Sequence, residues 1–434
     1  MEGIMPDLTR QDAARLKSKL MNAPVAPGGL APVINVGTEH LLNVLEEQYF
    51  KHDLADGISC FKYLEGDYGT GKSQFIQCLA DRAHHHGIVT SLVTIGQECP
   101  FSSPLSIYRN VVSSFVPASR EAGAEEQKGI EILIQRWIRS ELRKHGVTPG
   151  NAVPDEVKNQ IGRPFEEPYL GASDMQAGAA VKALGRRLLA MEAGADLSSA
   201  DTELISWIRG DNIRSAGLKQ THGLYEPATD ATAFQRLKTV VHFLRSRLNY
   251  RGFLIAFDEG TRTMSFRRGT VKQRQAIENM LTMINQNAEG EFGGVMFLYA
   301  ATPELRTDVI QNTYIALKDR IGSVAFIPGQ PMTPLIKLDD INTDATLAKI
   351  GQRLLDVFSV ADRHQWNEPM QLDNMKALIN AEKRLLGFPT TVPPRYFVYH
   401  WCLLLESQRS NERVIDLAAA GQFVESNRLP ESEA

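Results

Sequence analysis

The sequence predicts a three-layer α/β fold with a mainly parallel β-sheet at its centre. A glycine-rich run at residues 66–73 matches the phosphate-loop pattern G-x-x-x-x-G-K-[ST], between a strand-like and a helix-like stretch. Two later segments, residues 253–257 and 295–299, are continuous apolar runs, as expected of strands buried on both faces. Together these observations predict an α/β core that binds a phosphorylated ligand.

The phosphate loop itself reads GDYGTGKS, and its three glycines let the backbone wrap closely around an anion. Before it, ISCFKYLEG alternates like a strand; after it, KSQFIQCLADRAHHHG places Phe75, Ile76 and Leu79 at helical spacing. Lys72 is expected to reach the β- and γ-phosphates, and the Ser73 hydroxyl to bind Mg²⁺. The expected nucleotide-binding residues are Gly66, Asp67, Tyr68, Gly69, Thr70, Gly71, Lys72, Ser73 and Gln74.

The segments after the loop predict a second strand at VTSLVTIGQE and a helix at PLSIYRNVVSSFV, with Ile107, Val111 and Phe115 on one face. Residues 119–232 then read as helical segments broken by Gly and Pro, which indicates a helical insertion in the core.

A pair of carboxylates ends the apolar run at residues 253–257: Asp258 and Glu259. Ligands bind at the carboxyl ends of the strands in open α/β sheets, so both should lie beside the phosphate loop. We expect Asp258 to hold Mg²⁺ through its water shell and Glu259 to polarise the attacking water. In isolation, an acidic turn after a strand is equally typical of this pattern.

Two further polar residues follow the apolar run at 295–299. Thr302 is placed to orient water near Glu259, and Thr-Pro-Glu-Leu also fits a helix N-cap with Pro at N1, which is a compatible role. Arg320 is suited to stabilise transition-state charge on a neighbouring subunit's nucleotide. A surface salt bridge, for example with Asp319, explains Arg320 equally well.

The chain of 434 residues is long enough for two or three domains. We expect an N-terminal segment (1–30), a nucleotide-binding core (31–118 and 233–330), the helical insertion (119–232) and a helical lid (331–434). No apolar run approaches the length of a membrane span, and the four cysteines show no C-x-x-C pair, which favours a reduced, cytoplasmic protein without membrane contact.

In combination, these motifs resemble the AAA+ class of P-loop NTPases, in particular its origin-recognition and STAND-type branch. The order and spacing of VINVGTEHLL, LEGDYGTGKSQFI, FLIAFDEG, LYAATPEL and PPRYF resemble the ATP-binding proteins of BREX-type bacterial phage defence. The resemblance implies an ATP-driven or ATP-gated subunit, working as a homo-oligomer with other defence proteins, with ATP and Mg²⁺ as cofactors.

The resemblance also assigns individual residues. Arg395 corresponds to a lid arginine that moves onto the γ-phosphate, although an exposed residue at a helix start would look the same. Arg320 stands where this class carries its trans-acting arginine. In the box that contacts the nucleotide base, Thr38 replaces the usual arginine.

A basic segment at residues 261–275 directly follows the carboxylate pair and contains no acidic residue. DNA is a possible ligand of this segment, but the net charge of −4 favours a subunit contact or a solvated basic face. Its basic residues are Arg262, Arg267, Arg268, Lys272 and Arg274.

The functional alternatives are a continuously working ATPase, a slow nucleotide-gated switch or scaffold that recruits partners, and a small-molecule kinase. Kinases of the last kind usually lack the carboxylate pair, so Glu259 argues against that reading. The rate of ATP turnover separates the first two alternatives. A continuously working ATPase should hydrolyse ATP without pause, whereas a switch should stall with bound nucleotide.

Overall fold

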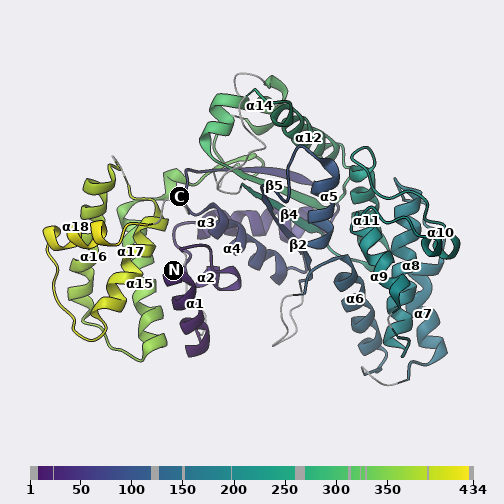
Figure 1. The fold of residues 1–434 in the computed structure, drawn as a ribbon, viewed down its shortest axis with the longest axis horizontal. Coiled ribbons are helices and arrows are strands. Elements are labelled where there is room, and N and C mark those ends of the chain that lie inside the picture. Colours follow the sequence, from purple (N-terminus) through teal and green to yellow (C-terminus); the bar gives the residue numbers. More distant parts are fainter. Residues whose placement is uncertain are drawn as a thin grey trace.

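The computed structural model describes residues 8–22, 24–118, 127–148, 152–196, 198–259, 269–310, 314–322, 324–327, 330–388 and 391–429 (Figure 1). The strands are β1 (Cys60–Glu65), β2 (Val89–Ile95), β3 (Phe115–Val116), β4 (Phe253–Glu259), β5 (Val295–Ala301) and β6 (Leu335–Lys337). The helices of the first half are α1 (Arg10–Asn22), α2 (Ala31–Ile34), α3 (Glu39–Leu45), α4 (Lys72–His85), α5 (Pro104–Ser113), α6 (Ile130–Lys144), α7 (Asp155–Glu166), α8 (Met175–Glu192), α9 (Ser199–Ile208) and α10 (Ala216–His222). Those of the second half are α11 (Ala233–Leu248), α12 (Val271–Ala288), α14 (Ile315–Ile321), α15 (Asp344–Asp362), α16 (Glu368–Leu386), α17 (Pro394–Gln408) and α18 (Leu417–Ser426). Short helical turns are η1 (Gly28–Leu30), η2 (Glu46–Asp53), η4 (Leu305–Ile310) and η5 (Asp339–Ile341).

Within the described residues the sheet has six strands in the order β3-β2-β4-β5-β1-β6, and only β3 runs antiparallel to its neighbour. The prediction of a mixed α/β core with a mainly parallel sheet is therefore confirmed. In the register, Asp258 lies between Thr94 of β2 and Ala300 of β5. Consequently the carboxyl ends of the central strands meet at the edge where the phosphate loop leaves β1.

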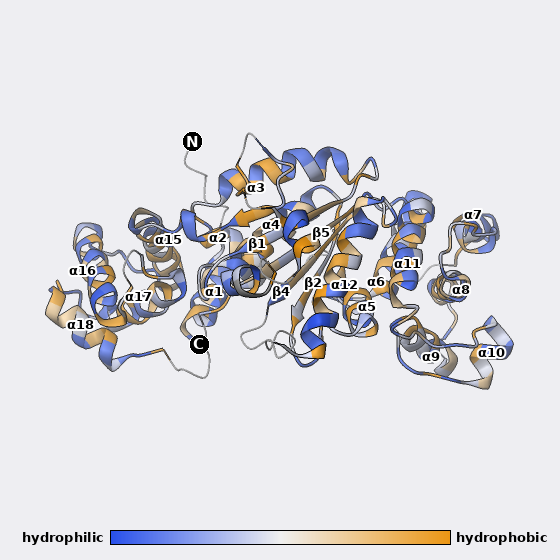
Figure 2. Ribbon diagram, turned by 90° about the horizontal axis from the view of Figure 1, so that it is seen from above, coloured by the Kyte–Doolittle hydropathy of each residue, from blue (hydrophilic) through white to orange (hydrophobic). Residues whose placement is uncertain are grey.

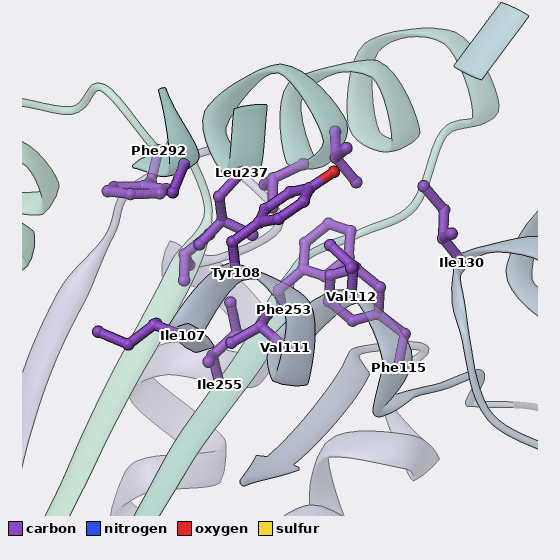
Figure 3. Close-up of a cluster of buried hydrophobic side chains, with 14 of the residues drawn as sticks. Ile107, Tyr108, Val111, Val112, Phe115, Ile130, Leu237, Phe253, Ile255 and Phe292 are labelled. Atoms are coloured by element: carbon purple, nitrogen blue, oxygen red, sulfur yellow. The ribbon is translucent and has the colours of Figure 1, made fainter. Parts of the chain in front are cut away.

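Helices cover both faces of the sheet, as alternation along β4 requires. On one face, Leu254 and Ala256 pack in the same buried cluster as Phe75 of α4. On the other face, α5 and α11 lie over β4; Figure 3 shows Val111 of α5 beside Ile255, with Leu237 of α11 in the same cluster. The helix expected over PLSIYRNVVSSFV ends at Ser113, because Phe115 and Val116 pair with β2 instead.

The insertion helices α6–α10 lie at the opposite end of the sheet from α15–α18 (Figures 1 and 2). Their apolar side chains continue the buried cluster of the α5 and α11 face rather than forming a core of their own. Arg236 of α11 anchors this contact, because it bonds Asp174 at 2.9 Å and lies 4.5 Å from the Trp207 ring centroid. The predicted insertion is thus packed tightly onto the core.

One prediction tests this packing. A Cβ on Gly185 of α8 would lie 2.1 Å from a ring carbon of Phe165, whose ring is held by Trp137 and Phe243. Because the ring has no room to move, Gly185→Ala should lower the free energy of unfolding by about 1–3 kcal/mol. Urea unfolding followed by tryptophan fluorescence measures this, since Trp137 lies in the insertion.

The matched control is Gly217→Ala in α10, where the nearest atom to a new Cβ is 3.6 Å away. That variant should be as stable as the wild type or slightly more stable, because alanine favours helix over glycine. Equal losses in both variants would contradict the packing argument.

Two boundaries differ from the sequence expectation. Helix α1, expected in a separate N-terminal segment, buries Leu16 and Leu20 in one cluster with Phe358 and Trp401 of the C-terminal helices. Residues 335–337, expected in the lid, form β6 and pair with Tyr63–Glu65 of β1. The C-terminal helical unit therefore includes the N-terminal helix, and the sheet extends past residue 330.

Partly buried charges hold α1 in this position. Lys17 lies 2.6 Å from both Asp362 of α15 and Glu406 of α17, and its ammonium is 4.8 Å from the Phe358 ring centroid. Figures 1 and 2 show α1 beside α15, between the C-terminal helices and the sheet. Among the described residues, no helix is both long and apolar enough to cross a membrane.

Candidate functional site

The phosphate loop has the tight conformation that its glycines permit. Gly69 and Gly71 have φ of +81° and +102°, a region that other residues rarely adopt. A Cβ on Gly66 would lie 2.5 Å from the Thr70 hydroxyl oxygen, and that hydroxyl donates to Asp67 O at 2.8 Å. The three glycines are therefore needed for the turn that presents Lys72 and Ser73 at the start of α4.

Lys72 is buried at the base of this loop. Its ammonium donates to Gly66 O at 2.6 Å and to Asp67 O at 3.0 Å. Burial lowers the pKa of Lys72 below its usual value, and the carboxylates of Asp258 and Glu259 oppose that shift. The Lys72 ammonium thus lies close to the two carboxylates predicted to act with it.

Asp258 accepts a hydrogen bond from the Ser73 hydroxyl. Burial raises the pKa of Asp258, while the bond from Ser73 and the charge of Lys72 oppose the increase. A hydroxyl and a carboxylate side by side are the hard oxygen donors that Mg²⁺ prefers, so the residues present fit this ion.

Glu259 is held by the backbone of the next strand. The N–H of Thr302 donates to Glu259 Oε2 at 3.0 Å, just beyond the end of β5. The structure thus brings Thr302 to Glu259, as its position in the sequence suggested, through a main-chain group. A role of the Thr302 hydroxyl in orienting water stays a prediction.

Lys72, Ser73, Asp258 and Glu259 line one cavity of about 480 Å³. Its phosphate end consists of loop residues, Thr94 and the two carboxylates. Its other walls come from the N-terminal segment and from the C-terminal helices, and they are mainly apolar, as a nucleotide base requires. The cavity-lining residues are Leu20, Pro24, Val25, Ala26, Pro27, Ile34, Tyr68, Gly69, Gly71, Lys72, Ser73, Gln74, Gln77, Thr94, Asp258, Glu259, Ile350, Pro394, Arg395 and Val398.

The apolar walls were not identified from the sequence. Gln74 of α4 donates to Ala31 O at 2.6 Å, and Gln77 accepts from the Gly28 N–H, so α4 holds the N-terminal segment over the loop. Neither contact follows from a motif, because the partners lie more than 40 residues apart. Gln74 lines the cavity, as predicted for a nucleotide-binding residue.

Three predicted binding residues are placed differently. Gly66 and Asp67 shape the loop without lining the large cavity, and Thr70 faces a smaller adjoining cavity of about 50 Å³. Thr38 lines the same small cavity, and its hydroxyl donates to Asn35 Oδ1 at 2.6 Å.

The start of α17 reaches the loop directly. The Arg395 N–H donates to Gly69 O at 3.1 Å, and the Arg395 guanidinium carbon lies 4.9 Å from the Tyr68 ring centroid. The structure therefore brings Arg395 to the phosphate end of the cavity, where the sequence interpretation expected it.

Other predicted residues lie elsewhere. Arg320, on α14, is exposed and does not line its own chain's cavity. In the described part of the chain Arg320 forms no ion pair, so the alternative of a surface salt bridge, for example with Asp319, is not supported within one chain. Lys272 and Arg274 are exposed in the first turn of α12, whereas Arg262, Arg267 and Arg268 lie outside the described residues.

Comparison with known proteins gives one finding. A family model described as BREX system ATP-binding protein BrxC/D matches residues 11–418, nearly the whole chain. No curated protein and no solved structure matches the chain.

Proposed function

Because the chain belongs to the family of BREX system ATP-binding proteins BrxC/D, we propose that it is a Mg²⁺-dependent ATPase of the AAA+ type. It would act as an assembly, motor or gating subunit of a bacterial phage-defence complex. The observation that carries the proposal is one cavity lined by Lys72, Asp258 and Glu259. The phosphate loop and the carboxylate pair come from strands separated by β5, and only the fold brings them together.

In this proposal the chain binds the phosphates first. The Lys72 ammonium turns from two loop carbonyls to the β- and γ-phosphates, and α4 offers the partial positive charge of its N-terminus. Ser73, and Asp258 through water, would hold Mg²⁺, and the ion would supply positive charge beside the phosphates.

Glu259 then polarises the attacking water. The Thr302 N–H orients the Glu259 carboxylate. The Asp258 carboxylate, at the preceding position, stays turned toward Ser73. Neighbouring positions on a strand face opposite ways, so two adjacent carboxylates take separate roles. Arg395 at the same end of the cavity supplies positive charge opposite the γ-phosphate.

The purified protein should release phosphate from ATP with Mg²⁺ and stop when EDTA is added. A protein that binds ATP without turnover would instead be the nucleotide-gated switch. Failure to bind ATP would overturn both readings.

Lys72→Ala should abolish or severely weaken ATP binding, because the phosphates lose their buried point-charge partner. Equilibrium binding of a fluorescent ATP analogue measures this. Lys51→Ala is the matched control, since Lys51 is exposed at the end of η2 and pairs with Glu47. Unchanged affinity of the Lys72 variant would refute the phosphate-loop assignment.

A further inference from the structure

The phosphate loop carries an aromatic ring that its sequence pattern does not require. Position three of G-x-x-x-x-G-K-[ST] is unrestricted, and here it is Tyr68. The guanidinium of Arg395 lies over the face of this ring, with 4.9 Å between its central carbon and the ring centroid. This geometry is a cation–π contact, which depends on the ring face rather than on the hydroxyl.

The backbone on both sides of Tyr68 is tied independently of its side chain. The Asp67 N–H donates to the Asp339 carboxylate at 3.2 and 3.3 Å, and the Asn342 amide donates to Thr70 O at 3.1 Å. The Arg395 N–H bonds Gly69 O. Removing the ring should therefore leave the loop in place and release the guanidinium.

Backbone contact alone does not orient the arginine. The Arg395–Gly69 bond fixes where α17 begins, but the long side chain beyond it keeps several rotatable bonds. The Tyr68 ring supplies a contact at the far end of the side chain, where it holds the guanidinium itself. Both side chains line the cavity beside Lys72 and Ser73, so the charge is held at its phosphate end.

We propose that Tyr68 is a positioning residue, whose ring holds the Arg395 guanidinium where it contacts the γ-phosphate and thereby separates ATP from ADP. The inference rests on the proposed function, because it assigns Arg395 to the same nucleotide. It adds a residue that makes the C-terminal helices sensitive to the number of phosphates bound.

The test compares the dissociation constants of ATPγS and ADP, measured calorimetrically with Mg²⁺, and requires no turnover. Tyr68→Leu should weaken ATPγS by about 3- to 10-fold, the scale of one cation–π contact, and leave ADP unchanged. Tyr68→Phe keeps the ring face and should match the wild type. In an Arg395→Ala background, Tyr68→Leu should cause no further loss.

Several outcomes would contradict the role of Tyr68. Losses that add in the double variant, or an equal loss for both nucleotides, would overturn the inference, because the ring would then act without Arg395. Equal wild-type affinity for ATPγS and ADP would overturn it as well. Wild-type protein that binds neither nucleotide would refute the proposed function itself. Thermal unfolding of each variant shows whether the loop region still folds, and Tyr68→Phe keeps the comparison decisive if Tyr68→Leu does not.

Discussion

Arg320→Ala is expected to reduce ATP hydrolysis by about 10³–10⁵-fold while leaving ATP binding intact, the effect of losing an arginine supplied in trans. The proposal rests on exposure: Arg320 stands near the end of α14 and does not line its own chain's cavity. A guanidinium donated across a subunit boundary completes a site only when protomers assemble. Hydrolysis per subunit should therefore rise with protein concentration.

Mixing experiments make this result specific. Arg320→Ala supplies an intact phosphate loop and Lys72→Ala supplies an intact Arg320, so a mixture should recover part of the activity at shared interfaces. Lys318→Ala, exposed on the same helix, is the matched control and should hydrolyse ATP like the wild type. The measurement is phosphate release against total protein. A strictly linear dependence, together with an active Arg320→Ala protein, would identify a monomeric switch.

Glu259→Gln is expected to keep ATP binding and lower turnover by about 10²–10⁴-fold, the usual contribution of a general base. The amide keeps the shape of the side chain, and its oxygen still accepts from the Thr302 N–H. It cannot polarise water as the carboxylate does, so only the chemical step is affected.

Single-turnover phosphate release with a saturating excess of protein separates this step from binding. Glu304→Gln, an exposed glutamate two residues after Thr302, is the control and should be fully active. If Glu259→Gln hydrolyses ATP near the wild-type rate, Glu259 has no catalytic role and another group must activate water.

The sequence identified β4 and β5 because both are buried on both faces and therefore read as unbroken apolar runs. It did not identify β3 and β6, which have only two and three residues. Segments that short carry no periodicity, and the prolines before β6 resemble a hinge. Pairing with an existing strand, a tertiary effect, makes them strands.

The site divides in a similar way. Lys72, Ser73, Asp258 and Glu259 were predicted because nucleotide chemistry needs these residue types at the carboxyl ends of strands in one parallel sheet. The apolar walls from Val25, Ile350 and other residues were not, since three distant segments form them. The position of Arg395 was predicted from its order relative to the other motifs. Its contact with the Tyr68 ring was not, because the two residues lie far apart in the sequence.

The position of α1 has a consequence for how the protein is made. Lys17 and its partner Asp362 are separated by 345 residues, and the apolar face of α1 is covered by helices translated after the whole sheet. At about 5–20 residues per second, roughly 20–70 s pass between the appearance of α1 at the ribosome and that of its partners. Throughout that interval Leu16 and Leu20 stay uncovered, so α1 is translated before the sheet but is buried only after the sheet is made. A chaperone that binds nascent chains would have a long opportunity there, and the part of the nucleotide pocket's wall that α1 and the C-terminal helices form would be completed only after those helices are made.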